Sequence, residues 1–218
     1  MESQRLYCSV LYTDLDKLKS TGTKEAAFFS FIKDHKEKTV NGYPVRPIAS
    51  VRNTPTEKID WILSKILSQV SPHVAAHLSN TEFLIQIFDE LNLQNLENKV
   101  FVSLDVNKLY PSIPIQLGIE NSMSCIKENW NKIDTFGLSL ERIEKMLTFI
   151  CYNYIIRYNN EFYKQVSGVQ MGAHFAPSFA IIFMNHIEKT ALSKLSFAPA
   201  IYKRYIDDWD QWNILIRF

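Results

Sequence analysis

Two apolar segments far apart in the chain each lead into acidic side chains, and this feature restricts the fold more than any other. Residues 100–104 are rich in β-branched and aromatic residues, which predicts a buried strand, and Asp105 follows it. Residues 200–206 are mainly apolar and lead into Asp207 and Asp208. Adjacent carboxylates repel each other unless a cation neutralises them. A polar turn between two strands is the other interpretation of the aspartate pair.

The three acids favour a particular chemistry if the fold brings them together. Mg²⁺ prefers carboxylate and substrate phosphate oxygens to a site built wholly from protein groups. Two such ions can hold the attacking and leaving oxygens of an in-line phosphoryl displacement. Asp105, Asp207 and Asp208 therefore suggest a nucleotidyl transferase.

Composition is that of an ordinary globular protein. The chain has 218 residues, 46% hydrophobic and 22% charged, which suits one domain or two small ones. The net charge of +1 is weak for a nucleic-acid-binding protein, so a binding face would need clustered basic residues. Several lie close together in the N-terminal third: Lys33, Lys36, Lys38, Arg46 and Arg52.

Other sequence features concern the compartment. No apolar run is long enough to span a membrane, and the N-terminus does not look like a secretory signal. Cys8, Cys125 and Cys151 are too widely spaced to indicate a disulfide framework or a zinc cluster. We therefore expect an intracellular protein that is neither secreted nor membrane-bound.

Local patterns predict most of the secondary structure. Residues 31–48 suggest a hairpin with a basic loop, and residues 155–163 suggest a second hairpin that turns at Asn159-Asn160. Thr54 is expected to cap a helix that has Pro55 in its first turn and Glu57 completing a capping box. Further helices are expected at 81–92, with Phe83, Leu84, Ile87, Phe88 and Leu91 facing inward, at 115–127 and 140–154, and after Pro177.

His73 and His77 have a zinc-compatible spacing but no third ligand nearby, so a surface or core role is favoured.

Three segments resemble known motifs. FVSLDVNKLY, SGVQMGAHFAPSFA and KRYIDD resemble motifs A, B and C of reverse transcriptases, in that family's order, within a resemblance that runs from about Phe31 to Asp208. The chain is most similar to the Penelope-like retroelement type, which is related to telomerase. The resemblance implies an α+β fold with right-hand polymerase fingers and a ferredoxin-like palm built on a small antiparallel sheet. The implied division is residues 1–98 for the fingers and palm-supporting helices and 99–218 for the palm.

The resemblance also implies an activity. The chain would be an RNA-directed DNA polymerase that adds dNMP to a primer 3′-hydroxyl by phosphoryl transfer at two Mg²⁺ ions, with Mn²⁺ as a substitute. Asp105, Asp207 and Asp208 would be catalytic metal ligands, joined by the backbone carbonyl of Val106. The partners would be an RNA template, a DNA primer and a dNTP, without a membrane, and the location would be nuclear.

The remaining site residues are implied in the same way. Lys33 or Lys36 together with Arg46 would contact the triphosphate, and Tyr110 would exclude a 2′-hydroxyl by steric contact. The other expected dNTP contacts are Gln165 and Gly172, and the expected template-primer contacts are Gly168, Met171 and Tyr205.

Two departures from the family pattern support a second hypothesis. Ala173-His174-Phe175-Ala176 stands where Ser-Pro-Leu-Ser is more usual, and Asp210 and Gln211 interrupt the strand expected after Asp208. The primer grip, the thumb and the GIY-YIG nuclease of many such elements do not follow. The chain is therefore expected to be a fragment or a decayed copy, and a catalytically inactive nucleic-acid-binding remnant is the alternative function.

Overall fold

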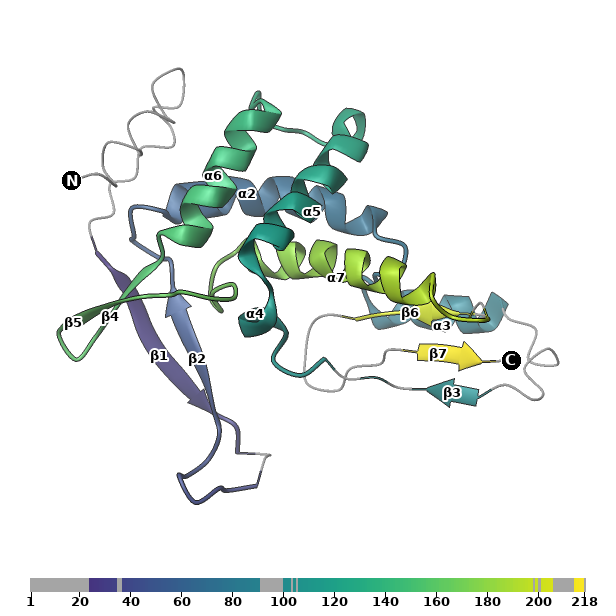
Figure 1. Cartoon of the computed structure of the whole chain (residues 1–218), viewed down its shortest axis with the longest axis horizontal. Helices are drawn as coiled ribbons and strands as arrows, with labels where there is room; N and C mark the ends of the chain where they lie inside the picture. The colour runs from purple at the N-terminus through teal and green to yellow at the C-terminus, as the bar shows by residue number, and fades with distance from the viewer. Residues whose placement is uncertain are drawn as a thin grey trace.

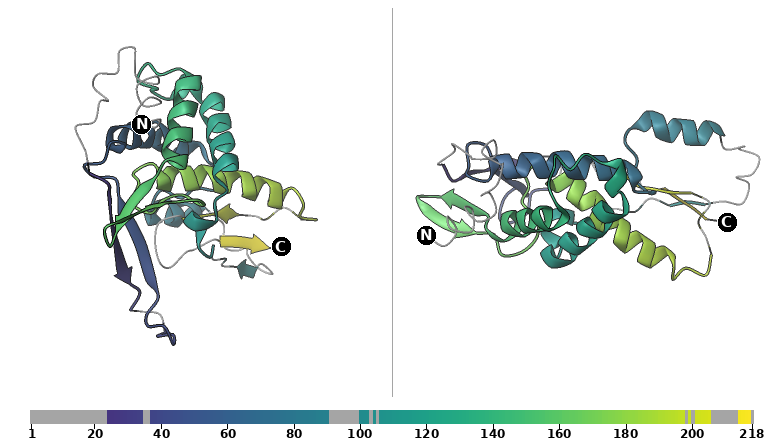
Figure 2. Two further views of the ribbon diagram at one scale, coloured as in Figure 1. Left: turned by 60° about the vertical axis from the view of Figure 1, so that its left-hand side comes forward. Right: turned by 90° about the horizontal axis from the view of Figure 1, so that it is seen from above.

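The computed structural model of the chain describes residues 24–34, 37–90, 100–102, 104, 106–197, 199, 201–205 and 214–217. Over these residues it shows an α+β fold with one four-stranded sheet and one three-stranded sheet. The two sheets lie toward opposite ends of the long axis, and packed helices lie between them (Figure 1 and Figure 2). None of the described helices is long and apolar enough to cross a membrane.

The four-stranded sheet combines two hairpins. In spatial order its strands are β2 (Val45–Ser50), β1 (Ala26–Ile32), β4 (Ile155–Tyr158) and β5 (Glu161–Lys164). β1 pairs antiparallel with β2 and parallel with β4, so both predicted hairpins are confirmed and they share one sheet. The turn between β4 and β5 has positive φ at Asn159 (50°) and Asn160 (64°), a conformation that asparagine tolerates well.

The three-stranded sheet has β7 at its centre. Its strands are β3 (Val100–Val102), β7 (Ile214–Arg217) and β6 (Tyr202–Lys203), and β7 is antiparallel to both neighbours. Leu215 pairs with Val102 on one side and with Tyr202 on the other. β3 and β6 therefore run in the same direction and end at the same edge of the sheet, where β7 begins. The polar residues expected to break the strand after Asp208 do not prevent β7 from pairing.

Four long helices supply most of the core. They are α2 (Glu57–Val70), α5 (Ile115–Glu128), α6 (Leu140–Tyr152) and α7 (Ala176–Leu192). The apolar faces of α2 and α6 are buried, and Phe179 and Ile182 of α7 are fully buried. A side chain at Gly118 would lie 2.5 Å from the ring of Phe179, so glycine is required where α5 crosses α7. The shorter elements are η2 (Ser71–His73), α3 (Thr81–Glu90), α4 (Leu109–Ser112) and η4 (Trp130–Lys132).

The start of α2 differs from the prediction. The helix begins at Glu57 after Thr56, and Thr54 does not cap it. The Thr54 hydroxyl instead donates to the carbonyl of Val51 at 2.6 Å, because residues 51–56 form tight turns before the helix. The Glu57 carboxylate still accepts from a preceding backbone amide, that of Asn53, at 2.9 Å.

The inward face expected for α3 is confirmed only in part. Leu84, Ile87 and Phe88 are half-buried, Phe83 is 41% exposed, and Leu91 lies outside the described residues. The helical period was predicted correctly, but periodicity alone does not specify a packing partner, and α3 lies away from the other long helices (Figure 2). Ile187 near the end of α7 is likewise 39% exposed.

Candidate active site

The loop between β5 and α7 lies against two other parts of the predicted site. Val169 donates its backbone N–H to the carbonyl of Tyr110 at 2.9 Å, and Ala49 donates to the carbonyl of Met171 at 2.9 Å. Residues 168–172, which we call the glycine loop, are therefore hydrogen-bonded both to α4 and to β2. This arrangement joins segments that are far apart in the sequence.

Both glycines of this loop are required by close backbone approach. Gly168 has φ +69°, and a Cβ there would lie 2.5 Å from the Cα of Pro111. Gly172 has φ +112°, and a Cβ there would lie 2.5 Å from the carbonyl oxygen of Ala49 and 3.1 Å from the side chain of Ile48. A larger residue would thus meet both positive φ and backbone atoms, which explains the two glycines of the motif.

Arg46 lies on β2, the strand whose Ile48 and Ala49 approach Gly172. Side chains two apart on a strand point to the same face, so Arg46 lies on the same face of β2 as Ile48, which borders Gly172. Arg46 pairs with Phe31 of β1 and is half-buried. Lys33 is also half-buried, and its backbone N–H bonds the carbonyl of Pro44 at 2.8 Å. Arg46 is therefore held on the face of the sheet that borders the glycine loop.

Tyr110 lies on the other side of the glycine loop, and Val106 precedes it in the chain. Both are half-buried and pack against the hydrophobic core. α4 begins after Lys108, which adopts a left-handed conformation with φ 53° and turns the chain into the helix. The hydrogen bond from Val169 then fixes the backbone of Tyr110 beside Gly168.

Two other predicted contact residues, Gln165 and Tyr205, follow β5 and β6 in the chain. Gln165 donates its backbone N–H to Tyr154 at 3.2 Å, and its side-chain amide donates to the carbonyl of Ser167 at 3.0 Å. Tyr205 is half-buried directly after β6. The Gln165 side-chain amide nitrogen is therefore bonded within its own loop.

The predicted acidic residues lie outside the described residues. These are Asp105, Asp207 and Asp208, and Lys36 is outside them as well. Among the residues that the structure describes, no group of three or more His, Cys, Asp or Glu side chains could hold a metal ion. Of the two histidines with zinc-compatible spacing, His73 is exposed and His77 is half-buried.

A buried ion pair anchors the strand that leads toward Asp207. The Nε of Arg204 donates to one carboxylate oxygen of Glu188, and its Nη2 lies 3.3 Å from the other. Both residues are buried, with exposed fractions of 2% and 4%. Tyr202 donates its hydroxyl to the same carboxylate at 2.9 Å. Glu188 belongs to α7, so the helix that follows the glycine loop also holds β6.

The backbone at Arg204 is fixed as well. Its N–H donates to Ala76 at 2.7 Å, and its carbonyl accepts from Leu78 at 2.9 Å. Burial, together with the nearby Arg204 charge, lowers the pKa of His77. Burial and the Glu188 charge raise the pKa of the Tyr202 hydroxyl. The last described residues before Asp207 are therefore held by side-chain and main-chain bonds.

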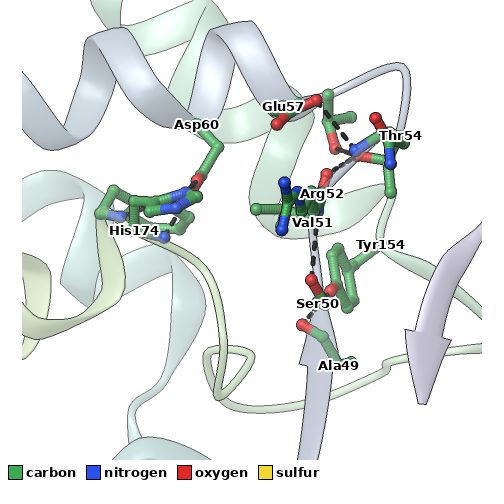
Figure 3. Close-up of polar contacts among 12 residues, drawn as sticks. Ala49, Ser50, Val51, Arg52, Thr54, Glu57, Asp60, Tyr154 and His174 are labelled. Atoms are coloured by element: carbon green, nitrogen blue, oxygen red, sulfur yellow. Dashed lines mark hydrogen bonds and ion pairs between the residues drawn. The ribbon is translucent and has the colours of Figure 1, made fainter. Parts of the chain in front are cut away.

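A second buried carboxylate holds the start of α7. Asp60 of α2 is fully buried and accepts hydrogen bonds from the backbone and the ring of His174 and from the backbone of Phe175 (Figure 3). Burial raises the pKa of Asp60, against the lowering effect of the His174 hydrogen bonds. Nearby, the Tyr154 hydroxyl donates to the carbonyl of Ala49 at 2.6 Å.

The sequence interpretation missed both buried acids. Asp60 precedes Leu63 and Leu67 by three and seven residues, and Glu188 follows Met184 by four, so each acid lies on a buried helical face. A charge at such a position is seldom buried without a partner. This signal was present in the sequence, although the partners were not evident.

Comparison with known families gives one match. The family described as Reverse transcriptase (RNA-dependent DNA polymerase) matches residues 35–209. That range is most of the chain, and it includes the glycine loop, α4 and the segment that contains Asp207 and Asp208. No curated protein matches the chain.

Proposed function

Because the chain belongs to the reverse transcriptase (RNA-dependent DNA polymerase) family, we propose that it extends a primer by two-metal phosphoryl transfer at Asp105, Asp207 and Asp208. The family indicates an RNA template, a DNA primer and dNTP substrates. In the proposed reaction, the primer 3′-oxygen bonds to the α-phosphorus of the dNTP and pyrophosphate leaves.

The strand topology carries this proposal. β3 and β6 flank β7 and end at one edge of the sheet, about 10 Å apart at two strand spacings. Asp105 is the third residue after Val102 and Asp207 the fourth after Lys203, so extended chain gives each a reach of about 10–14 Å from its strand. This geometry is compatible with the acids meeting at that edge.

The proposed ligands suit a divalent cation. Three carboxylates and the Val106 carbonyl offer only oxygen donors, the set that Mg²⁺ prefers and that Mn²⁺ also accepts. When bound, the ions neutralise charge on the transferring phosphoryl group and lower the pKa of the primer hydroxyl. The buried ion pair between Arg204 and Glu188 would keep β6, the strand before Asp207, from shifting during the reaction.

The remaining residues would orient the substrates. Arg46 and one of Lys33 or Lys36 would offset triphosphate charge, and the Tyr110 ring would exclude a ribose 2′-hydroxyl. The proposed contacts to the base pair and to template and primer are Gln165, Gly168, Met171, Gly172 and Tyr205. Support comes from the glycine loop, whose backbone bonds bring the strand of Arg46 and the helix of Tyr110 to its two sides.

We further propose that the chain belongs to a Penelope-like element and acts in the nucleus. Residues 1–98 would form the fingers region, and residues 99–218 would form the palm, with the three-stranded sheet at its centre. The four-stranded sheet includes β4 and β5, which the fingers would then borrow from the second segment of the chain.

Primer extension on an RNA template tests the function. Wild type should incorporate dNTPs with Mg²⁺, and Asp207→Asn should lower the rate at least about a hundredfold, because a metal ligand that stabilises the transition state is lost. Asp89→Asn on the exposed surface of α3 is the matched control and should extend at the wild-type rate. Duplex binding by a wild type that never extends would support the inactive remnant instead.

A further inference from the structure

The contact between Asp60 and His174 joins α2 to the segment just before α7, across 114 residues of sequence. The Asp60 carboxylate is fully buried and accepts from the His174 backbone N–H at 2.9 Å, from its ring Nδ1, and from the Phe175 N–H at 3.3 Å. Figure 3 shows the His174 ring turned toward Asp60. Each described contact of this carboxylate therefore goes to residues 174 and 175.

These two residues link the glycine loop to α7. Gly172 ends the loop, and α7 begins at Ala176. Helix N-termini leave backbone N–H groups without helical partners, and a carboxylate there satisfies them and suits the helix dipole. Phe175 precedes the helix with no side-chain cap of its own, so Asp60 supplies this acceptor from α2.

A carboxylate is a costly way to fill this position. Burial disfavours its charged form, as the raised pKa of Asp60 reflects. Replacing a buried ionic contact with apolar residues often leaves stability unchanged or improves it. The carboxylate instead fixes the local geometry, because its oxygens hold two backbone N–H groups and one ring nitrogen in place.

The fixed segment leads directly into the glycine loop. The loop bonds to β2 through Met171 and Ala49 and to α4 through Val169 and Tyr110. Ala173 and Phe175 are buried on either side of His174, whose own side chain is 54% exposed. A shift at residues 174–175 would therefore move Gly172 against β2.

We propose that Asp60 is a positioning residue for nucleotide binding, acting through His174 and Phe175 to fix the glycine loop. This inference rests on the proposed function, since it takes the loop as part of the dNTP site. Asp60 does not touch the substrate. Its effect is on the placement of the loop backbone between Arg46 and Tyr110.

Three variants separate the donors. Asp60→Asn keeps the shape of the side chain but removes its charge and one acceptor. His174→Ala removes the ring and keeps the backbone N–H, whereas His174→Pro removes both donors. Ser71→Ala is the control, because it deletes another buried side-chain hydrogen bond at the far end of α2, to Leu67 at 3.2 Å.

Two measurements follow, on the whole chain. Amide hydrogen exchange without nucleic acid should rise at residues 168–175 in Asp60→Asn and His174→Pro, and less in His174→Ala. In primer extension, the KM for dNTP should rise about tenfold in the first two variants, with kcat and duplex affinity changing less. The double variant Asp60→Asn with His174→Pro should raise the dNTP KM by less than the product of the two single effects, because both changes weaken the same contact.

The outcomes distinguish this inference from the proposed function. Wild type that does not extend primers refutes the function, while the exchange experiment still reports whether Asp60 holds the loop. Unchanged exchange at residues 168–175 in His174→Pro overturns the inference, and so does a dNTP KM that rises equally in Ser71→Ala. If Asp60→Asn does not fold, the two His174 variants provide the same comparison.

Discussion

Glu188 on α7 holds the side chain of Arg204 through both carboxylate oxygens, with the two side chains almost completely buried. This contact connects the helix that follows the glycine loop to the strand that leads toward Asp207. One Arg204 nitrogen, Nη1, has no hydrogen-bond partner among the residues that the structure describes. The pair is thus an incompletely satisfied buried charge network, which depends strongly on both members.

Breaking this pair should be strongly destabilising. Glu188→Leu or Arg204→Met should each lower the free energy of unfolding by about 3–5 kcal/mol, because one buried charge loses its partner. Tyr202→Phe removes only a hydroxyl and should cost about 1 kcal/mol. Urea unfolding monitored by circular dichroism measures these differences.

The double variant provides the control. Arg204→Met combined with Glu188→Leu removes both charges and should be more stable than either single variant. A double variant whose losses simply add would show that the two side chains do not interact in the folded chain.

Stability should also depend on His77. Burial lowers the pKa of His77 below its ordinary value of 6.5, so the folded chain keeps it neutral while the unfolded chain takes up a proton. Stability from this group is therefore complete above pH 6.5 and is lost as pH falls through 6.5 toward the folded pKa, by at most about 1.4 kcal/mol per pH unit.

Unfolding titrations from pH 7.5 to 5.5 check this sign. His77→Gln should flatten the pH dependence, whereas His186→Gln, a change on the exposed surface of α7, should keep it. Equal slopes in wild type and His77→Gln would rule out the assigned group.

The glycines differ in what a methyl group would meet. Gly172→Ala combines φ +112° with a contact of 2.5 Å to the carbonyl of Ala49, so the loop must move or the helix start must shift. Gly137 also has positive φ, at +75°, but nothing lies within 4 Å of its missing Cβ. Gly137→Ala should therefore cost only about 1–2 kcal/mol of backbone strain, and Gly172→Ala clearly more, in chemical denaturation.

Activity should follow the same order. Gly172→Ala should raise the dNTP KM in primer extension, while Gly137→Ala should leave it unchanged, since residue 137 lies in the turn before α6. Similar losses of stability in the two variants would mean that the loop can relax away from β2.

Much of this architecture was predictable from local patterns. Apolar spacing predicted α2, α6 and α7, because a helix with one buried face must repeat its apolar residues every three or four positions. The Asn159-Asn160 turn predicted the β4–β5 hairpin through its tolerance of positive φ. The two glycines of the loop were expected to contact the nucleotide and the template-primer, which stays a prediction, whereas their close approach to the backbone of Pro111 and Ala49 was not predicted.

Long-range contacts were not predictable in the same way. The partners of Gly172 and Asp60 are distant in sequence, and no local period relates them. The predicted face of α3 is only half-buried for the same reason, since amphipathicity does not specify which surface packs against it. Thr54 does not cap α2, because its hydroxyl donates to the carbonyl of Val51 in the preceding turn.

Tyr110 should control the choice of sugar. Its backbone is fixed beside Gly168 by the Val169 hydrogen bond, and its side chain is half-buried against the core. Tyr110→Ala should raise the kcat/KM for rNTPs relative to dNTPs about tenfold or more, because the proposed steric contact with the 2′-hydroxyl is removed. Tyr110→Phe keeps the ring and should retain the wild-type preference, so discrimination that survives in Tyr110→Ala would exclude this role.

Arg46 offers the sharpest comparison, because Arg157 lies on the same face of the same sheet. Register places Phe31 opposite Arg46 and Ala27 beside Arg157, and residues 27 and 31 share one face of β1. Arg157 lies near Glu25, 3.9 Å away, at the end of the sheet remote from Arg46.

If Arg46 binds the triphosphate, Arg46→Ala should raise the dNTP KM about 10- to 100-fold, the equivalent of one lost charge-assisted hydrogen-bond pair. Arg46→Lys should recover only part of this loss, because an ammonium group cannot form the paired contacts of a guanidinium. Arg157→Ala removes the same charge from the same face and should leave the dNTP KM within about twofold of wild type, whereas equal effects of the two alanine variants would indicate a general charge effect on template binding, which falls steeply with added salt.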